Sequence, residues 1–255
     1  MPAADVVTDA LLADWARICD ALGKPAFRRA TERAAALVTG AAAAPLNIVF
    51  TTRADASRFE VEALLRLVAE SGLPHCLQVR PETAAELTAL PRDRGMAEGT
   101  RIPLMALDAG AAAGLEVAPG SQLSVRRLAP EEAPLHASLL EAGFGVPSLV
   151  FQQLMTPAVL ALPGASCYVG SLGGQAVCTA FGFTEGEHVG IYNVATRPEH
   201  RGRGCGATIT ARAVMDGFAS GASYAFLQSS VMGYRGYQRL GFRELESWSF
   251  WMTTT

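Results

Sequence analysis

The alternation of hydrophobic and polar positions changes period several times along this chain, and each change predicts a new element. In segment 204–219, apolar residues recur at i, i+3, i+4 and i+7, which gives a helix one apolar face. In segment 224–228, a short apolar run lies between serines, which is typical of a buried strand. The pattern therefore predicts an α/β (α+β) chain in which helices and short strands are mixed.

The same reasoning assigns elements to both halves of the chain. Gly173 and Gly174 separate two strand-like runs and predict a hairpin. In the C-terminal half, predicted strands cover 123–128, 167–172, 175–184, 188–196, 224–228 and 247–253, and predicted helices cover 130–142, 148–160, 204–219 and 232–239. In the N-terminal half, predicted helices cover 5–22, 25–39, 57–71 and 82–90, and predicted strands cover 47–51, 75–79 and 100–107.

The two halves end in the same order of elements: helix, glycine, short strand, short helix, glycine with a hydrophobic residue, and last strand. Gly72 corresponds to Gly221 and Gly95 corresponds to Gly241, which indicates a weak internal repeat. Chance similarity between two α/β segments is the alternative. The small, Gly- and Ala-rich segment 108–121 has the composition of a linker. We therefore expect two domains, 1–120 and 121–255.

Composition excludes several classes of protein. The net charge of −3 and the absence of a long basic run argue against nucleic-acid binding. The five cysteines are odd in number and never form a CxxC pair, so we expect no metal site, no disulfide framework and a reducing, cytoplasmic setting. No segment predicts a signal peptide or a membrane span, so we expect no membrane partner.

The segment 191–207, IYNVATRPEHRGRGCGA, carries the clearest chemistry. A strand-like run leads through a polar turn into glycines interleaved with arginines and then into a helix. Backbone N–H groups at a helix N-terminus and arginine side chains both favour a phosphate, which predicts a pyrophosphate site. Three alternatives are a plain surface turn, a nucleotide P-loop and a dinucleotide fingerprint. The P-loop lacks its Gly-Lys-Ser/Thr, and the fingerprint lacks an acid after the next strand.

Two motifs together resemble the GNAT N-acyltransferase superfamily. Arg201-x-x-Gly204-x-Gly206, after a strand ending Asn-Val-Ala-Thr-x-Pro, is similar to its acyl-CoA loop, and Tyr237-x-x-Leu-Gly-Phe is similar to a second family motif. The resemblance covers about residues 123–252. It implies a mixed, mostly antiparallel sheet flanked by helices, in two tandem domains. The first domain would be a degenerate copy, because segment 51–60 contains no glycine loop.

The resemblance also implies a site. Tyr237 would protonate the departing CoA thiolate, which suits a phenol of pKa about 10. Ser230 stands where the family often has an asparagine, and Gly233 and Gly236 weaken the helix that carries Tyr237. The implied acetyl-CoA-binding residues are Asn193, Val194, Ala195, Thr196, Arg201, Gly202, Arg203, Gly204, Cys205, Gly206, Ala207 and Ser230.

The leading hypothesis is an acetyl-CoA-dependent N-acetyltransferase acting on an amine of a small molecule or peptide. The alternatives are a non-catalytic acyl-CoA-binding regulator and, more weakly, a nucleotide-dependent oxidoreductase that binds NAD. The general base stays unassigned: Glu185, Glu187 and His188 are candidates that turn or strand positions explain equally well. Tyr234, on the same helical face as Tyr237, would either line the site or pack within the fold. The acceptor and the oligomeric state stay open.

Overall fold

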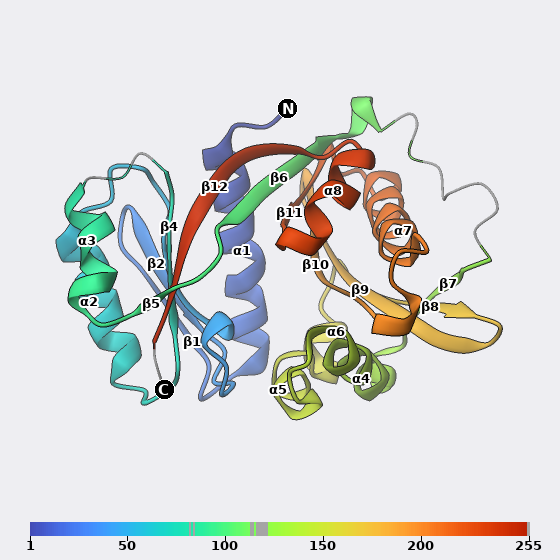
Figure 1. Ribbon diagram of the computed structural model, residues 1–255, viewed down its shortest axis with the longest axis horizontal. Helices are drawn as coiled ribbons and strands as arrows, with labels where there is room; N and C mark the ends of the chain where they lie inside the picture. The colour runs from blue at the N-terminus through green and yellow to red at the C-terminus, as the bar shows by residue number, and fades with distance from the viewer. Residues whose placement is uncertain (82, 84, 113–114, 116–121, 254–255) are drawn as a thin grey trace. The chain divides into compact units, whose positions relative to one another are not determined.

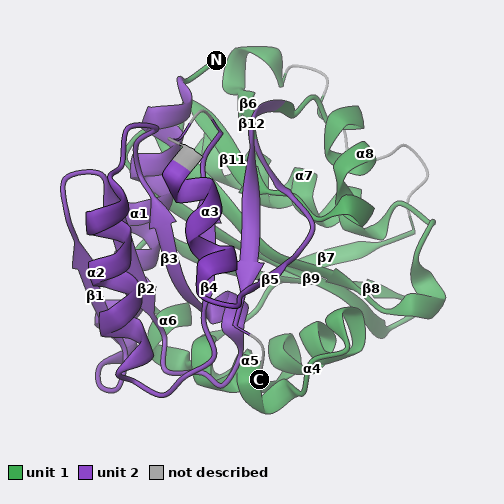
Figure 2. Ribbon diagram, turned by 60° about the vertical axis from the view of Figure 1, so that its left-hand side comes forward, with its two compact units in different colours: residues 1–2, 105–243 green, residues 3–104, 244–255 purple. Residues whose placement is uncertain are grey.

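The computed structural model describes residues 1–81, 83, 85–112, 115 and 122–253. The chain forms two compact units, shown in different colours in Figure 2. Unit 1 contains residues 1–2 and 105–243, and unit 2 contains residues 3–104 and 244–255. The expected boundary at residue 120, and most of the expected linker, lie outside the described residues. The closing segment 244–255 is grouped with the N-terminal residues, so the units are not two consecutive stretches of sequence.

Unit 1 is built on a mixed sheet whose strands follow the order β6-β11-β10-β9-β8-β7. The pairs from β7 to β10 are antiparallel, and β10 and β11 are parallel. The strands are β6 (Ile102–Asp108), β7 (Ser124–Arg127), β8 (Ala165–Leu172), β9 (Gln175–Glu185), β10 (His188–Thr196) and β11 (Tyr224–Gln228). The predicted hairpin is confirmed: Gly173 and Gly174 both have positive φ, as a two-residue turn between twisted strands requires.

Helices cover both faces of this sheet (Figure 1). Thr179 of β9 contacts His136 of α4, whereas its neighbours Cys178 and Ala180 belong to the core beneath α7. Side chains of a strand alternate between faces, so α4 and α7 lie on opposite sides. The helices of unit 1 are α4 (Ala133–Phe144), α5 (Ser148–Leu154), α6 (Pro157–Leu160), α7 (Cys205–Ala219) and α8 (Val231–Arg239).

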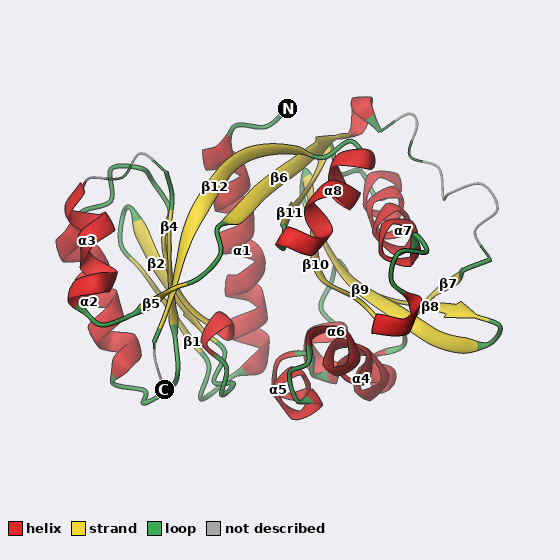
Figure 3. Ribbon diagram, viewed as in Figure 1, coloured by secondary structure: helices red, strands yellow, loops and turns green. Residues whose placement is uncertain are grey.

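Unit 2 has a sheet of order β1-β2-β3-β4-β12, with β5 paired to β12. Here β3 and β4 are parallel and the other pairs are antiparallel. Helix α1 covers one face, and α2 and α3 cover the other (Figure 3). The elements are α1 (Ala4–Leu22), β1 (Phe27–Ala30), β2 (Ala34–Val38), β3 (Asn47–Thr51), α2 (Arg58–Ala69), β4 (Cys76–Val79), α3 (Ala85–Asp93), β5 (Ala97–Glu98) and β12 (Arg243–Met252).

The two sheets share one plan. Each has two antiparallel pairs, then a parallel pair, then a closing strand: β8-β9-β10-β11-β6 in unit 1 and β1-β2-β3-β4-β12 in unit 2. The closing strand comes from the other half of the sequence in both cases. Strand β6 precedes the C-terminal half and lies beside β11, whereas β12 ends that half and pairs with β4.

The helix predicted over 25–39 is wrong. The structure has an antiparallel pair there, β1 and β2, and every residue of β2 is buried. A short, wholly apolar run has no periodicity that separates a buried helix from a buried strand, and the alanines favoured helix. The predicted helix 148–160 is interrupted at Met155 and Thr156. In the predicted helix 82–90, residues 82 and 84 lie outside the described residues.

Candidate functional site

The glycine and arginine loop runs directly into helix α7. After β10 ends at Thr196, a turn over Pro198–His200 leads into the loop 201–204, which is exposed. Gly202 and Gly204 have φ of 75° and 79°, a region that favours glycine. Gly204 is the N-cap, so no side chain caps α7, and its first turn contains no acidic residue. The N-terminal N–H groups and the positive end of the helix dipole are therefore left to an outside acceptor.

Arg201 fastens this loop to two neighbouring elements. Its Nη2 donates to the Gly143 carbonyl oxygen of α4 at 2.6 Å, and its Nε donates to the Thr196 carbonyl oxygen of β10 at 3.3 Å. Gly143 also lets α4 approach β10 closely, because an added Cβ would lie 2.7 Å from the Ala195 Cβ. Arg201 thus has a positioning role that the sequence did not predict. Arg203 is exposed on the same loop.

Strands β10 and β11 separate where they approach the loop. Their parallel pairing covers three residue pairs and ends at Gly190 and Phe226. Beyond this point β10 bulges: its register with β9 shifts between Tyr192 and Ala195, and Asn193 has φ of 52°. The Asn193 Nδ2 contacts the Met155 Sδ at 3.2 Å, which holds the bulge. A bulge of this kind bends a strand and ends its pairing.

Tyr237 of α8 is held by close ring contacts. An added Cβ on Gly233 would lie 2.6 Å from the Tyr237 Cε2, and the Phe242 ring meets the tyrosine edge-on at a centroid distance of 6.0 Å. Burial raises the pKa of Tyr237 to about 12, and the side chain of Thr210 in α7 opposes this shift. The phenol is therefore protonated at neutral pH, as a general acid must be.

Two other predicted residues have visible local roles. Ser230 is the N-cap of α8, and its side chain accepts a hydrogen bond from the Gly233 N–H at 3.2 Å. Cys205 is 3% exposed and belongs to the core of unit 1, and burial raises the pKa of its thiol. Cysteine reactivity depends on the thiolate, so Cys205 packs rather than reacts.

Of the three candidate bases, His188 lies in a packing environment. His188 is 8% exposed, and its ring lies against Phe226 and Tyr224 at centroid distances of 5.6 and 6.0 Å. A histidine that sequence reasoning did not single out, His136, is fully buried, and its Nδ1 lies 2.6 Å from the Thr179 Oγ1. Burial lowers its pKa to about 3, so this imidazole is neutral and structural.

A cavity of about 360 Å³ lies along the C-terminal half of α7, at the opposite end of that helix from the loop. Asp216 lines it and accepts hydrogen bonds from Arg127, Arg212 and the Tyr168 hydroxyl. The Asp216 carboxylate therefore has its hydrogen-bond partners within unit 1, and none of the predicted site residues lines the cavity.

Among the described residues, no group of His, Cys, Asp and Glu is arranged for a metal, and no helix is long and apolar enough to span a bilayer.

Comparison with known proteins finds similar sequences and folds. Residues 138–242, which include the loop and Tyr237, match the model of the acetyltransferase (GNAT) family. The fold is a GNAT fold. A GCN5-related N-acetyltransferase from Kribbella flavida is similar over 100% of this chain and 97% of its own, with a TM-score of 0.73 and 19% identity. No curated protein matches the chain.

Two further GNAT structures are similar over nearly the whole chain. A GCN5-related N-acetyltransferase from Sphaerobacter thermophilus has a TM-score of 0.62 and 15% identity, over 96% of this chain and 84% of its own. A tandem GNAT protein from the clavulanic acid biosynthesis pathway has a TM-score of 0.57 and 15% identity, over 99% of this chain and 96% of its own. At these identities the likeness concerns the fold.

Proposed function

We propose that the chain is an N-acetyltransferase that moves an acetyl group from acetyl-CoA to an amine of a small molecule or peptide. One observation carries the proposal: α7, which starts without a capping side chain, is the next α-helix after β10, the strand that separates from its parallel neighbour. A pyrophosphate and an extended pantetheine arm need these two features side by side. The match to the GNAT family model over residues 138–242 supports this assignment.

The residues present fit acetyl-CoA. The N–H groups of Gly202–Ala207 would hold the pyrophosphate, with charge added by Arg203, because α7 has neither a capping side chain nor an acid in its first turn. The Arg201 N–H already donates to the Pro198 carbonyl oxygen at 3.2 Å. The arm would lie along Asn193–Thr196 and pair with backbone groups like an added strand. The Ser230 hydroxyl already accepts a hydrogen bond from the Gly233 N–H as the cap of α8. It would therefore contact the pantetheine arm through its O–H donor or its second lone pair.

The reaction needs one proton donor at the thiolate. The amine nitrogen attacks the thioester carbonyl carbon, the C–N bond forms and the C–S bond breaks. The departing thiolate takes the Tyr237 proton, and water takes the proton lost by the amine. Tyr237 is protonated at neutral pH, as a tyrosine of ordinary pKa is, and burial raises its pKa further, to about 12. A positioned acid of this kind contributes about 10²- to 10⁴-fold to a rate.

We further propose that the chain is a tandem GNAT protein, with residues 121–255 as the acyl-CoA-binding domain and 1–120 as a degenerate copy. The shared strand plan of the two sheets supports this. So does the similarity over nearly full length to a structure described as a tandem GNAT protein.

The test compares a phenylalanine variant with a matched control. Tyr237→Phe should lower kcat by about 10²-fold or more and leave the acetyl-CoA Kd unchanged. Tyr168→Phe also removes one hydroxyl from unit 1, but beside Asp216, and should keep full turnover. A Tyr237→Phe enzyme as fast as the wild type would refute the proposed role. Wild-type protein that binds acetyl-CoA but acetylates no amine would favour the regulator, and binding of NAD instead would favour the oxidoreductase.

A further inference from the structure

Unit 2 contains a topological counterpart of the proposed cofactor site. Strands β3 and β4 are parallel over three residue pairs, Ile48–Phe50 with Cys76–Gln78, as β10 and β11 are in unit 1. Helix α2 follows β3 as α7 follows β10, and α3 follows β4 as α8 follows β11. The N-terminus of α2 therefore corresponds to the N-terminus of α7, where the pyrophosphate would bind. The ends of β3 and β4 correspond to the place where β10 and β11 separate, which would hold the pantetheine arm.

The N-terminus of α2 is already occupied by a carboxylate. Ser57 caps the helix and accepts a hydrogen bond from the Glu60 N–H at 3.3 Å. The Glu60 Oε2 accepts from the Ser57 N–H at 3.0 Å, and its Oε1 accepts from the Arg33 N–H at 3.2 Å. The end of a helix that favours an anion thus holds the chain's own anion. A phosphate arriving there would meet a like charge, whereas the first turn of α7 has no acid.

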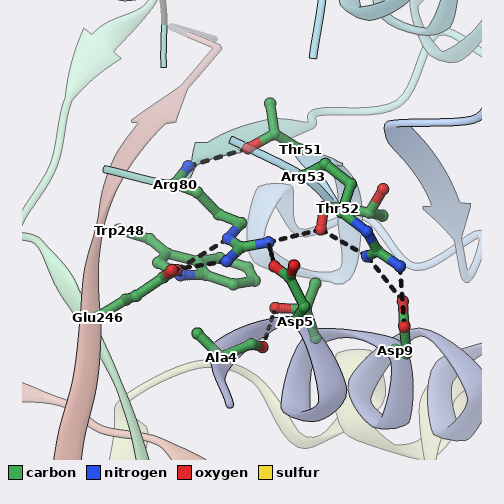
Figure 4. A network of polar contacts seen from close by, with 10 residues as sticks. Ala4, Asp5, Asp9, Thr51, Thr52, Arg53, Arg80, Glu246 and Trp248 are labelled. Atoms are coloured by element: carbon green, nitrogen blue, oxygen red, sulfur yellow. Dashed lines mark hydrogen bonds and ion pairs between the residues drawn. The ribbon is translucent and has the colours of Figure 1, made fainter. Parts of the chain in front are cut away.

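The ends of β3 and β4 are bridged by the side chain of Arg80, which follows β4 directly (Figure 4). Its Nη1 donates to the Thr52 carbonyl oxygen, just after β3, at 2.6 Å. The same atom donates to Asp5 at 2.6 Å, and Nε and Nη2 donate to the two carboxylate oxygens of Glu246 at 2.8 and 2.6 Å. The guanidinium group therefore fills the position between the two strand ends.

This arrangement is costly to open. The Arg80 side chain is 4% exposed and the Glu246 side chain 15% exposed, and the Trp248 Nε1 donates to the same carboxylate at 2.8 Å. A buried guanidinium separated from its partners loses charge-assisted hydrogen bonds that water cannot replace there. One arginine with two carboxylates also leaves a local charge of −1, which disfavours a polyanionic ligand.

We propose that the chain binds a single acetyl-CoA, in unit 1, because unit 2 fills both ends of the counterpart site with its own side chains: Glu60 at the helix N-terminus and Arg80 between the strand ends. The inference rests on the proposed function. It adds how many cofactor molecules bind and which side chains close the counterpart site in unit 2.

Calorimetric titration of the full chain with acetyl-CoA tests this. Wild-type protein should bind one molecule per chain. Gly204→Asp places an acid at the N-cap of α7, as Glu60 does near that of α2, and should abolish binding. Gly204 has φ of 79°, so a side chain there is strained and should lower the unfolding midpoint by roughly 2–8 °C; the titration is run well below the midpoint measured for this variant. Glu60→Gln should keep one site with an unchanged Kd.

The other outcomes are distinguishable. Two molecules per chain, or binding lost in Glu60→Gln, would place a cofactor in unit 2 and overturn the inference. One molecule still bound by Gly204→Asp would show that the start of α7 is not the pyrophosphate end, and would overturn it as well. No binding of acetyl-CoA to the wild type would instead refute the proposed function.

Discussion

Adding one methyl group at Gly233 tests whether Tyr237 is catalytic or only packs its helix, because the new carbon would displace the tyrosine ring. A Cβ there would lie 2.6 Å from the Tyr237 Cε2 and 3.3 Å from its Cζ. Ordinary contact begins at 3.4 Å, so in Gly233→Ala the ring must move by about 0.8 Å. A misplacement of about 1 Å in a reacting group lowers a rate by about 10²-fold. We expect kcat to fall by that factor, with an unchanged acetyl-CoA Kd.

Gly236→Ala is the matched control in the same helix. No atom lies within 4 Å of the point that a Cβ would occupy at Gly236, so alanine adds helix propensity without touching the tyrosine. We expect about 1 kcal/mol of added stability, which is roughly 2–4 °C in Tm for a chain of this size, and full turnover. In Gly233→Ala the same gain is offset by overpacking of about 1–3 kcal/mol.

Release of the CoA thiol, followed with a thiol reagent in the presence of an amine acceptor, measures kcat for both variants. Full turnover in Gly233→Ala would show that the ring position is unimportant and would refute Tyr237 as the acid. An equal loss in Gly236→Ala would assign the effect to helix flexibility.

Three further predictions concern pH and stability. Because the pKa of Tyr237 is raised to about 12, kcat should not fall between pH 8 and 10 on account of this group; an alkaline decline with a midpoint near 10 that Tyr237→Phe removes would contradict this. The pKa of His136 is lowered to about 3, so the unfolded state takes up a proton below pH 6.5 that the folded state excludes. The free energy of unfolding should therefore fall by about 1.4 kcal/mol per pH unit between about pH 6 and 4, and His136→Gln should lose that part of the slope in urea titrations. Arg80→Ala should cost about 3–5 kcal/mol, whereas Arg53→Ala, which breaks an exposed pair with Asp9, should cost less than about 1 kcal/mol; equal losses would refute the importance of burial.

Local pattern predicted the elements that are delimited by turn residues. Strands 47–51, 188–196 and 224–228 lie where expected, because each is an apolar run with clear breakers at its ends. The pattern failed at 25–39, where a buried alanine-rich strand has no helical or strand period. It also could not assign β12 to its sheet, since pairing with β4 depends on contacts distant in sequence.

The candidate site shows the same division. The glycine loop and Tyr237 are visible in the sequence as motifs. The missing capping side chain of α7 also follows from the sequence, because its N-cap residue is a glycine. The bond from Arg201 to the Gly143 carbonyl oxygen and the contact of Gly233 with Tyr237 arise only from packing.

The pairing of β12 with β4 has a consequence for synthesis on the ribosome. Val79 and Ser249, which are paired in this ladder, lie 170 residues apart in the chain. At the usual rate of translation, roughly 10 to 30 s pass between their appearances. During that interval β4 lacks the neighbour that completes its sheet, and an unpaired strand edge is open to other chains. Unit 1 ends at residue 243, so unit 2, whose first strands are translated before it, is the last to be completed.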